Sequence, residues 1–214
     1  QQYMRRIFDE NRIHFKGKFK IEAGEGKYVI YKHESPPVKE LLIDVLRDSC
    51  NLSSSSLFKY IAALRSKKQG TDEDGEIILK EFLVSRGIEN GSFKLKDGAG
   101  ESRYNLVTPH ALAKVLANMY NDKDLREHIV DLLPQYGVDG TVKYRQIKGP
   151  CLNCDVYAKT GTLQNNSALA GFYLPIRGKK YAFAIMINNH TLQTQEVKEL
   201  EDRILHLLLT SALF

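Results

Sequence analysis

The sequence has little that would support metal or redox chemistry. It contains three cysteines and no tryptophan in 214 residues. Only Cys151 and Cys154 form a C-x-x-C pair, and no second Cys or His pair accompanies them, so we predict no metal site and no cofactor. The pair precedes a predicted strand, whereas a thioredoxin-like site opens a helix. A small loop disulfide or two idle thiols is therefore favoured over redox function.

Long apolar runs and a dominant charge are also lacking. No run approaches the roughly 18 apolar residues that a membrane span needs, and no signal-peptide pattern opens the chain. Lys and Arg number 31 against 26 Asp and Glu, a formal net charge of +5. The basic residues are scattered among acidic ones, which is typical of a solvated surface and argues against a nucleic-acid partner. Because the chain begins with Gln1, we interpret it as a processed or partial piece. Nothing indicates its oligomeric state.

Helical patterns come first along the chain and strand patterns last. Apolar periodicity predicts helices over residues 2–10, 36–47, 54–65, 72–86, 109–119, 124–133 and 195–213. Capping signals stand at Ser35, Thr71 and Thr108. Alternating or continuous apolar runs predict strands over 27–33, 155–163, 168–174 and 180–187. Short turns between the last three indicate an antiparallel meander. The expected fold class is α+β, with helices packed on an antiparallel sheet.

Two predicted helices carry apolar stripes that should be buried. On the second long helix we expect the apolar side chains to face inward, which leaves Ser56 and Lys59 exposed; the members of that stripe are Leu57, Tyr60, Ile61 and Leu64. The last helix should lie on the sheet through Val197, Leu200, Ile204, Leu207 and Leu208.

The strand at 155–163 carries the sequence that points most directly to a function. Lys159, Thr160 and Gly161 offer a cation, a hydroxyl and an unobstructed strand edge within three residues. An extended peptide that ends in a carboxylate needs a charge, a neighbouring donor and free backbone groups to pair with. Lys159 alone is more often a solvated strand lysine, so this assignment depends on what accompanies it.

A second motif lies between two predicted helices. Ser49 and Asn51 form an S-x-N, and on their own they could be polar helix-end residues that bond the local backbone. S-x-N and K-T-G occur together, in this order, in serine enzymes that bind penicillin. Because the two motifs occur together and in this order, we interpret both as parts of an active site and not as local structural residues.

The wider sequence resembles the C-terminal part of the class C low-molecular-mass penicillin-binding proteins, the D-Ala-D-Ala carboxypeptidase/endopeptidase family. The similar segments are residues 33–37, 97–103, 105–109, 140–141, 158–163 and 169–171. The resemblance implies a β-lactamase/transpeptidase-like fold, incomplete at the N-terminus, with residues 1–214 as the C-terminal part of a penicillin-binding domain. It also implies an extracytoplasmic enzyme whose partners are peptidoglycan stem peptides and β-lactams.

The family's acyl-serine mechanism implies a role for each motif residue. Ser49 would relay a proton toward the leaving amine, and Asn51 would hydrogen-bond the substrate backbone and the general-base lysine. Lys159 would balance charge beside Ser49 and attract the terminal carboxylate. Thr160 and Thr162 would offer hydroxyls to that carboxylate beside Gly161, and the Thr162 N–H would form half of the oxyanion hole.

The third motif of the family, the S-x-x-K that carries the nucleophile, has no match before Ser49. Ser56 and Lys59 form the only S-x-x-K of the chain, but it follows the S-x-N, and we interpret it as coincidence. Two alternatives to a serine carboxypeptidase/endopeptidase stay open: a fragment that only binds the D-Ala-D-Ala end, and a serine β-lactamase. We interpret the loop at 97–103 as structural, with Arg103 able to pair with Asp97.

Overall fold

The computed structural model describes residues 2–17, 34–147 and 156–211, which form two compact units, Gln1–Ser35 and Pro36–Phe214. The first unit contains α1 (Gln2–Glu10), as predicted. The predicted strand at 27–33 and the pair Cys151 and Cys154 lie outside the described residues. No helix in the described ranges is long and apolar enough to cross a membrane.

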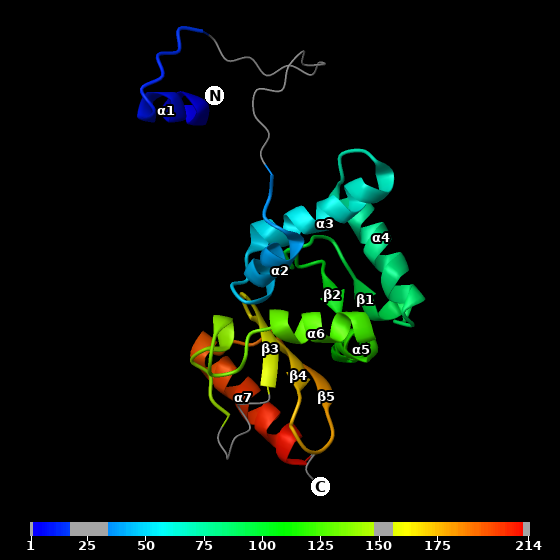
Figure 1. The fold of residues 1–214 in the computed structure, drawn as a ribbon. Coiled ribbons are helices and arrows are strands. Elements are labelled where there is room, and N and C mark those ends of the chain that lie inside the picture. The colour runs from blue at the N-terminus through cyan, green and yellow to red at the C-terminus, as the bar shows by residue number, and fades with distance from the viewer. Residues whose placement is uncertain (1, 18–33, 148–155, 212–214) are drawn as a thin grey trace. The chain divides into compact units, whose positions relative to one another are not determined.

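The centre of the second unit is the predicted meander (Figure 1). Its strands are β3 (Val156–Leu163), β4 (Asn166–Tyr173) and β5 (Tyr181–Asn188), each within two residues of its predicted bounds. The pairing is antiparallel in the order β3-β4-β5, with Lys159 opposite Ala170. Among the strands that the structure describes, this order places β3, and with it the K-T-G segment, on an edge of the sheet.

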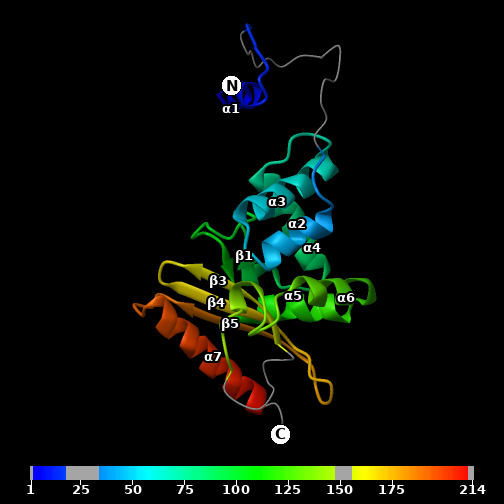
Figure 2. The same cartoon turned by 60° about the vertical axis from the view of Figure 1, so that its left-hand side comes forward.

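Helices cover both faces of this sheet (Figure 2). α7 (Thr194–Ser211) lies on one face, and its core includes Val156, Ala158 and Leu205. α5 (Pro109–Asn121) and α6 (Lys123–Leu132) lie on the other, where Phe172 is buried against Leu116. Successive strand side chains point to opposite faces, so the alternation in β3 separates the two cores.

The predicted stripe of α7 is partly wrong. Leu207 and Leu208 are 63% and 48% exposed. The buried positions recur at every fourth residue instead, and they are Val197, Glu201, Leu205 and Leu209. Burial of Glu201 moves the stripe, because its cationic partner comes from a distant loop that helical periodicity does not report.

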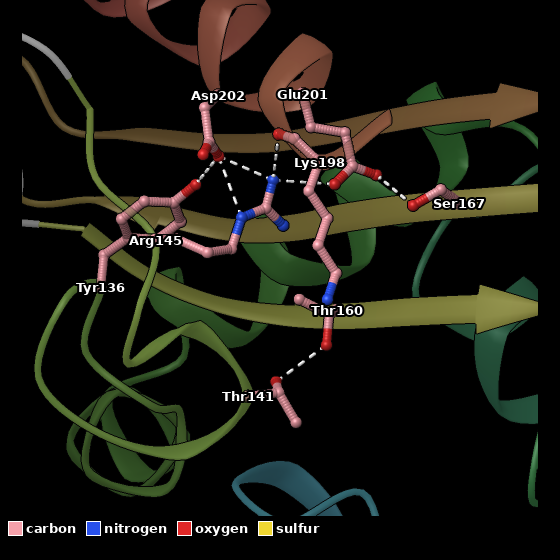
Figure 3. A network of polar contacts seen from close by, with 8 residues as sticks. All are labelled: Tyr136, Thr141, Arg145, Thr160, Ser167, Lys198, Glu201 and Asp202. Atoms are coloured by element: carbon pink, nitrogen blue, oxygen red, sulfur yellow. Dashed lines mark hydrogen bonds and ion pairs between the residues drawn. The ribbon is translucent and has the colours of Figure 1, made fainter. Parts of the chain in front are cut away.

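That partner is Arg145, at the centre of a buried polar network that we call the Arg145 cluster: Tyr136, Arg145, Ser167, Glu201 and Asp202 (Figure 3). Arg145 Nη2 lies 2.9 Å from a Glu201 carboxylate oxygen and 2.6 Å from one of Asp202. The Ser167 hydroxyl donates to Glu201 at 2.8 Å, and the Tyr136 hydroxyl donates to Asp202. The cluster fastens the loop after α6 to α7 and β4.

The remaining helices of the second unit pack against one another beside α6. α2 (Val38–Leu46) has no side-chain cap, and its N-cap position is Pro37, so the predicted cap at Ser35 is wrong. α4 (Asp72–Ser85) and α5 have the predicted caps: Thr71 accepts from Asp74 N–H and Thr108 from Ala111 N–H. The short segments are the 3-10 turns Asn90–Ser92 and Gly140–Val142 (η2) and the two-stranded pair of β1 (Phe93–Lys94) and β2 (Leu106–Val107).

α3 (Asn51–Ser66) starts three residues earlier than predicted, so Asn51 is its first residue. The predicted stripe of α3 is wrong: its buried side chains are Phe58 and Ala62, while Tyr60, Ile61 and Leu64 are exposed. The Phe58 side chain packs against Gly75 and Gly98. A Cβ added at Gly75 would come within 2.7 Å of the Phe58 ring, and one added at Gly98 within 2.4 Å of Phe58 Cβ. These two glycines decide which face of α3 is buried, and they belong to other segments.

Candidate active site

Ser49 lies in the turn between α2 and α3, in a backbone conformation that is unusual for serine. Its φ is +61°, in the left-handed region that costs an L-residue roughly 1 kcal/mol. The turn is closed by a hydrogen bond from Cys50 N–H to Asp44 O at 3.0 Å. Strained residues of this kind cluster at functional sites, where surrounding contacts hold them in place. The turn leaves the Ser49 side chain exposed.

The structure brings Lys159 to Ser49 across 110 residues of sequence. Lys159 Nζ donates to Ser49 Oγ at 2.8 Å and to the carbonyl oxygen of Thr160 at the same distance. Burial lowers the pKa of the Lys159 amine from its ordinary value, because the charged form loses hydration. The two predicted motifs therefore share one site, with a desolvated amine in direct contact with a hydroxyl.

The edge of β3 is half covered and half open. Pro134 O accepts from Ala158 N–H at 3.0 Å, and Tyr136 N–H donates to Val156 O at 2.9 Å. From Lys159 onward, no strand of the described chain pairs with this edge. Because alternate residues of a strand direct their backbone groups to the same side, the N–H groups of Thr160 and Thr162 face the open edge. An extended ligand can pair with these groups.

Asn51 has a partner in the loop at 97–103. Its Nδ2 donates to Glu101 Oε1 at 2.7 Å, and Ser54 Oγ donates to Gly98 O at 2.5 Å. This loop is folded around Asp97, which accepts backbone N–H groups of residues 100–102 and the side-chain amide of Asn105.

The hydrogen bonds that Asp97 accepts also explain its acidity. Burial acts to raise the pKa of Asp97, but the hydrogen bonds outweigh it and lower the pKa below its ordinary value. Arg103 is not among the partners of Asp97, so the pairing that we considered is not observed. The loop is structural, as expected, but through Glu101 it also contacts a predicted site residue.

The loop at 134–142 joins the Ser49 turn to the K-T-G strand. Arg47, two residues before Ser49, pairs with Asp139 at 2.6 Å. Its carbonyl oxygen accepts Thr141 N–H at 3.2 Å, and the Thr160 hydroxyl donates to the Thr141 hydroxyl at 2.8 Å. The loop thus bonds to both walls of the candidate site.

The S-x-x-K on α3 does not contribute to this arrangement. Ser56 and Lys59 are exposed, as predicted, and Lys59 Nζ pairs with Asp72 at 3.0 Å. This ion pair gives Lys59 a structural role between α3 and α4. Within the described ranges, no group of three His, Cys, Asp or Glu side chains could hold a metal ion.

Comparison with known proteins identifies the family. The sequence profile of the D-Ala-D-Ala carboxypeptidase 3 (S13) family matches residues 1–210. The chain belongs to this family. It is 35% identical over 188 residues to the D-alanyl-D-alanine carboxypeptidase DacB of Haemophilus influenzae. The matched region is 87% of this chain and 39% of that protein. Across four curated relatives the chain spans between 30% and 39% of their length.

Solved structures confirm the expected α+β, transpeptidase-like fold. Penicillin binding protein 4 (dacB) from Haemophilus influenzae, in complex with a β-lactam, superposes with a TM-score of 0.84 at 31% identity. The match covers 97% of this chain and 49% of that one. The TLA-1 extended-spectrum β-lactamase superposes with a TM-score of 0.55 at 16% identity, over 75% of this chain and 58% of that one, a likeness of fold alone.

Sequence reasoning about the carboxypeptidase family missed three residues that contact the candidate site. Glu101 and Thr141 lie in segments that carried the resemblance, but neither was given a role. Arg47 had no sequence signal, since a helix-end arginine is ordinarily a solvated charge. What distinguishes these residues is contact with Asn51, Thr160 and the Ser49 turn, and only the tertiary structure reports contact.

Proposed function

We propose that this chain supplies the S-x-N and K-T-G walls of a serine-type D-Ala-D-Ala carboxypeptidase/endopeptidase that acts on peptidoglycan stem peptides and binds penicillin. Membership in the carboxypeptidase family supports the reaction class. The observation that carries the proposal is the contact of Lys159 Nζ with Ser49 Oγ beside an open strand edge. We propose residues 1–214 as the C-terminal part of the penicillin-binding domain, and an extracytoplasmic location.

In this proposal the substrate lies along β3 as an added strand. Lys159 attracts the terminal carboxylate, and the hydroxyls of Thr160 and Thr162 donate to it, while Gly161 leaves room for the peptide. An added Cβ at Gly161 would meet nothing closer than Ala168 Cβ at 3.8 Å, so the space beside it is open. Asn51 aligns the peptide backbone through its side-chain amide.

The chemistry that we propose is acyl transfer in two steps. A serine hydroxyl oxygen attacks the carbonyl carbon of the penultimate D-Ala, and the developing oxyanion accepts the Thr162 N–H. The carbon–nitrogen bond then breaks, and the terminal D-Ala leaves after its nitrogen takes a proton through Ser49 and Lys159. Water, or an amine, attacks the acyl-enzyme and restores the serine. We assign neither the nucleophile nor its base lysine to a described residue.

One observation favours a second candidate function for this chain taken alone. Its S-x-x-K lysine is paired with Asp72 and lies on the exposed side of α3. The 214-residue chain by itself would then bind the D-Ala-D-Ala end without forming an acyl-enzyme. A serine β-lactamase is a third candidate, because these enzymes also carry S-x-N and K-T-G motifs.

Labelling with a fluorescent penicillin tests the proposal. The full-length protein should form a covalent adduct, and Lys159→Ala should slow acylation by roughly 100-fold or more, the scale on which a positioned proton-transfer group acts. Lys39→Ala, which removes an exposed lysine of α2, should acylate like the wild type.

Three outcomes would decide among the candidates. No adduct with the full-length protein contradicts the enzyme proposal. An adduct on the 214-residue chain, mapped to Ser56, would remove the binding-only alternative and reverse our interpretation of that motif. Rapid turnover of penicillin by the full-length protein would favour the β-lactamase reading.

A further inference from the structure

We infer that Thr141 is a further residue of the carboxylate subsite, where its hydroxyl directs the proton of Thr160 toward the ligand and so selects peptides with a free C-terminal carboxylate. The inference rests on the proposed function and deepens it. Thr141 belongs to η2, outside both predicted motifs, and its role is that of a positioning residue.

The contact between the two hydroxyls is direct. Thr160 Oγ1 and Thr141 Oγ1 lie 2.8 Å apart, and Figure 3 shows the bond between the strand and the loop. Thr160 is half-buried in β3, and Thr141 is exposed beside it. Thr160 follows Lys159 on the strand, and its carbonyl oxygen accepts from Lys159 Nζ at 2.8 Å. The hydroxyl pair therefore belongs to the segment where the carboxylate is proposed to bind.

The backbone of the loop holds Thr141 in position. Gly140 adopts φ +55°, and a Cβ there would come within 2.7 Å of Pro134 Cβ and 2.9 Å of Arg47 O. The close packing lets Thr141 N–H donate to Arg47 O at 3.2 Å. The ion pair between the side chains of Arg47 and Asp139, at 2.6 Å, joins the same two segments. These contacts hold the backbone of Thr141 in place, while its hydroxyl accepts from Thr160.

The chemistry follows from counting protons. Each hydroxyl has one proton to donate and two lone pairs to accept with, whereas a carboxylate only accepts. While Thr160 donates to Thr141, its proton is unavailable to a ligand. When a carboxylate binds, Thr160 must donate to it, and the bond reverses so that Thr141 donates to Thr160. A chain of two such bonds ending on an anion is stronger than the isolated contact.

The test compares two substrates in the full-length protein. One is an N-acyl-D-Ala-D-Ala with a free carboxylate, and the other is its C-terminal amide. Thr141→Val keeps the shape of the side chain but cannot donate. We expect KM for the carboxylate to rise about fivefold with kcat within twofold, on the scale of one hydrogen bond between neutral groups. KM for the amide should not change.

Two variants serve as controls. Thr141→Ser retains the hydroxyl and should restore KM for the carboxylate. Thr210→Val removes a threonine hydroxyl that donates to His206 O within α7, far from β3 in sequence, and should leave both substrates unaffected. Circular dichroism checks that each variant is folded. If Thr141→Val does not fold, a raised KM for the carboxylate in Thr141→Ser would still contradict the inference.

The outcomes separate the inference from the proposed function. A wild-type enzyme that cleaves neither substrate, or that cleaves both equally well, overturns the proposed carboxylate site and the inference with it. A wild-type preference for the carboxylate that Thr141→Val leaves intact overturns the inference alone. So does a fall in kcat for both substrates with KM unchanged, because that pattern indicates a merely structural role.

Discussion

Removal of the Arg145 side chain should destabilise the protein more than any change at an exposed ion pair. The Arg145 side chain is 6% exposed, and its partners Glu201 and Asp202 are 1% and 17% exposed. In Arg145→Met the two carboxylates would face each other without a cation, and the Lys198 carbonyl oxygen would lose the donor that it has at 2.8 Å. Breaking a buried pair by removing one partner costs about 3–5 kcal/mol, since the remaining charge stays desolvated.

A loss of about 4 kcal/mol is a large part of the stability of an ordinary domain. For a chain of this size, 1 kcal/mol corresponds to roughly 2–4 °C, so the midpoint of thermal unfolding should fall by roughly 8–16 °C. Urea unfolding followed by far-UV circular dichroism or by tyrosine fluorescence measures the free energy, as the sequence has 11 tyrosines and no tryptophan.

The matched control is Arg65→Met. Arg65 pairs with Glu81 at 2.5 Å, but both side chains are more than half exposed, at 58% and 56%. Exposed pairs contribute roughly 0–1 kcal/mol. The double variant Arg145→Met, Glu201→Gln should lose less than the sum of its single changes, because one uncompensated charge is removed. Equal losses of stability in Arg145→Met and Arg65→Met, or strict additivity in the double variant, would contradict this prediction.

Two further predictions concern the candidate site. Lys159→Met should raise the free energy of unfolding at pH 7. Burial lowers the pKa of Lys159 in the folded state, so the stability of the wild type rises as pH approaches 10.5. The stability difference between Lys159→Met and the wild type should therefore shrink in urea titrations from pH 7 to 10. A difference that stays constant over this range contradicts the prediction. Ser49→Gly should be more stable than Ser49→Ala by roughly 1 kcal/mol, because only glycine relieves φ +61°, while both slow acylation equally. Identical unfolding curves for the two would argue against the strain.

Local patterns were enough to predict most elements and the K-T-G wall. β3, β4 and β5 follow from alternating and apolar runs with short turns, and two of three predicted caps, Thr71 and Thr108, are present. These features depend on neighbours in sequence: the period of apolar side chains and the hydroxyl at a helix start. Ser35 failed as a cap because two prolines follow it, and the helix begins only after the second.

Sequence patterns alone were enough to identify the S-x-N and K-T-G motifs and to predict the sheet that carries K-T-G. The partners of these motif residues became apparent only in the folded chain. The contacts of Ser49 with Lys159 and of Thr141 with Thr160 each join separate segments, and helical periodicity does not place Glu201 inside. The physical reason is that a charge or hydroxyl is buried or bonded according to what faces it in space, and residues 19 or 110 positions apart meet only after the chain has packed.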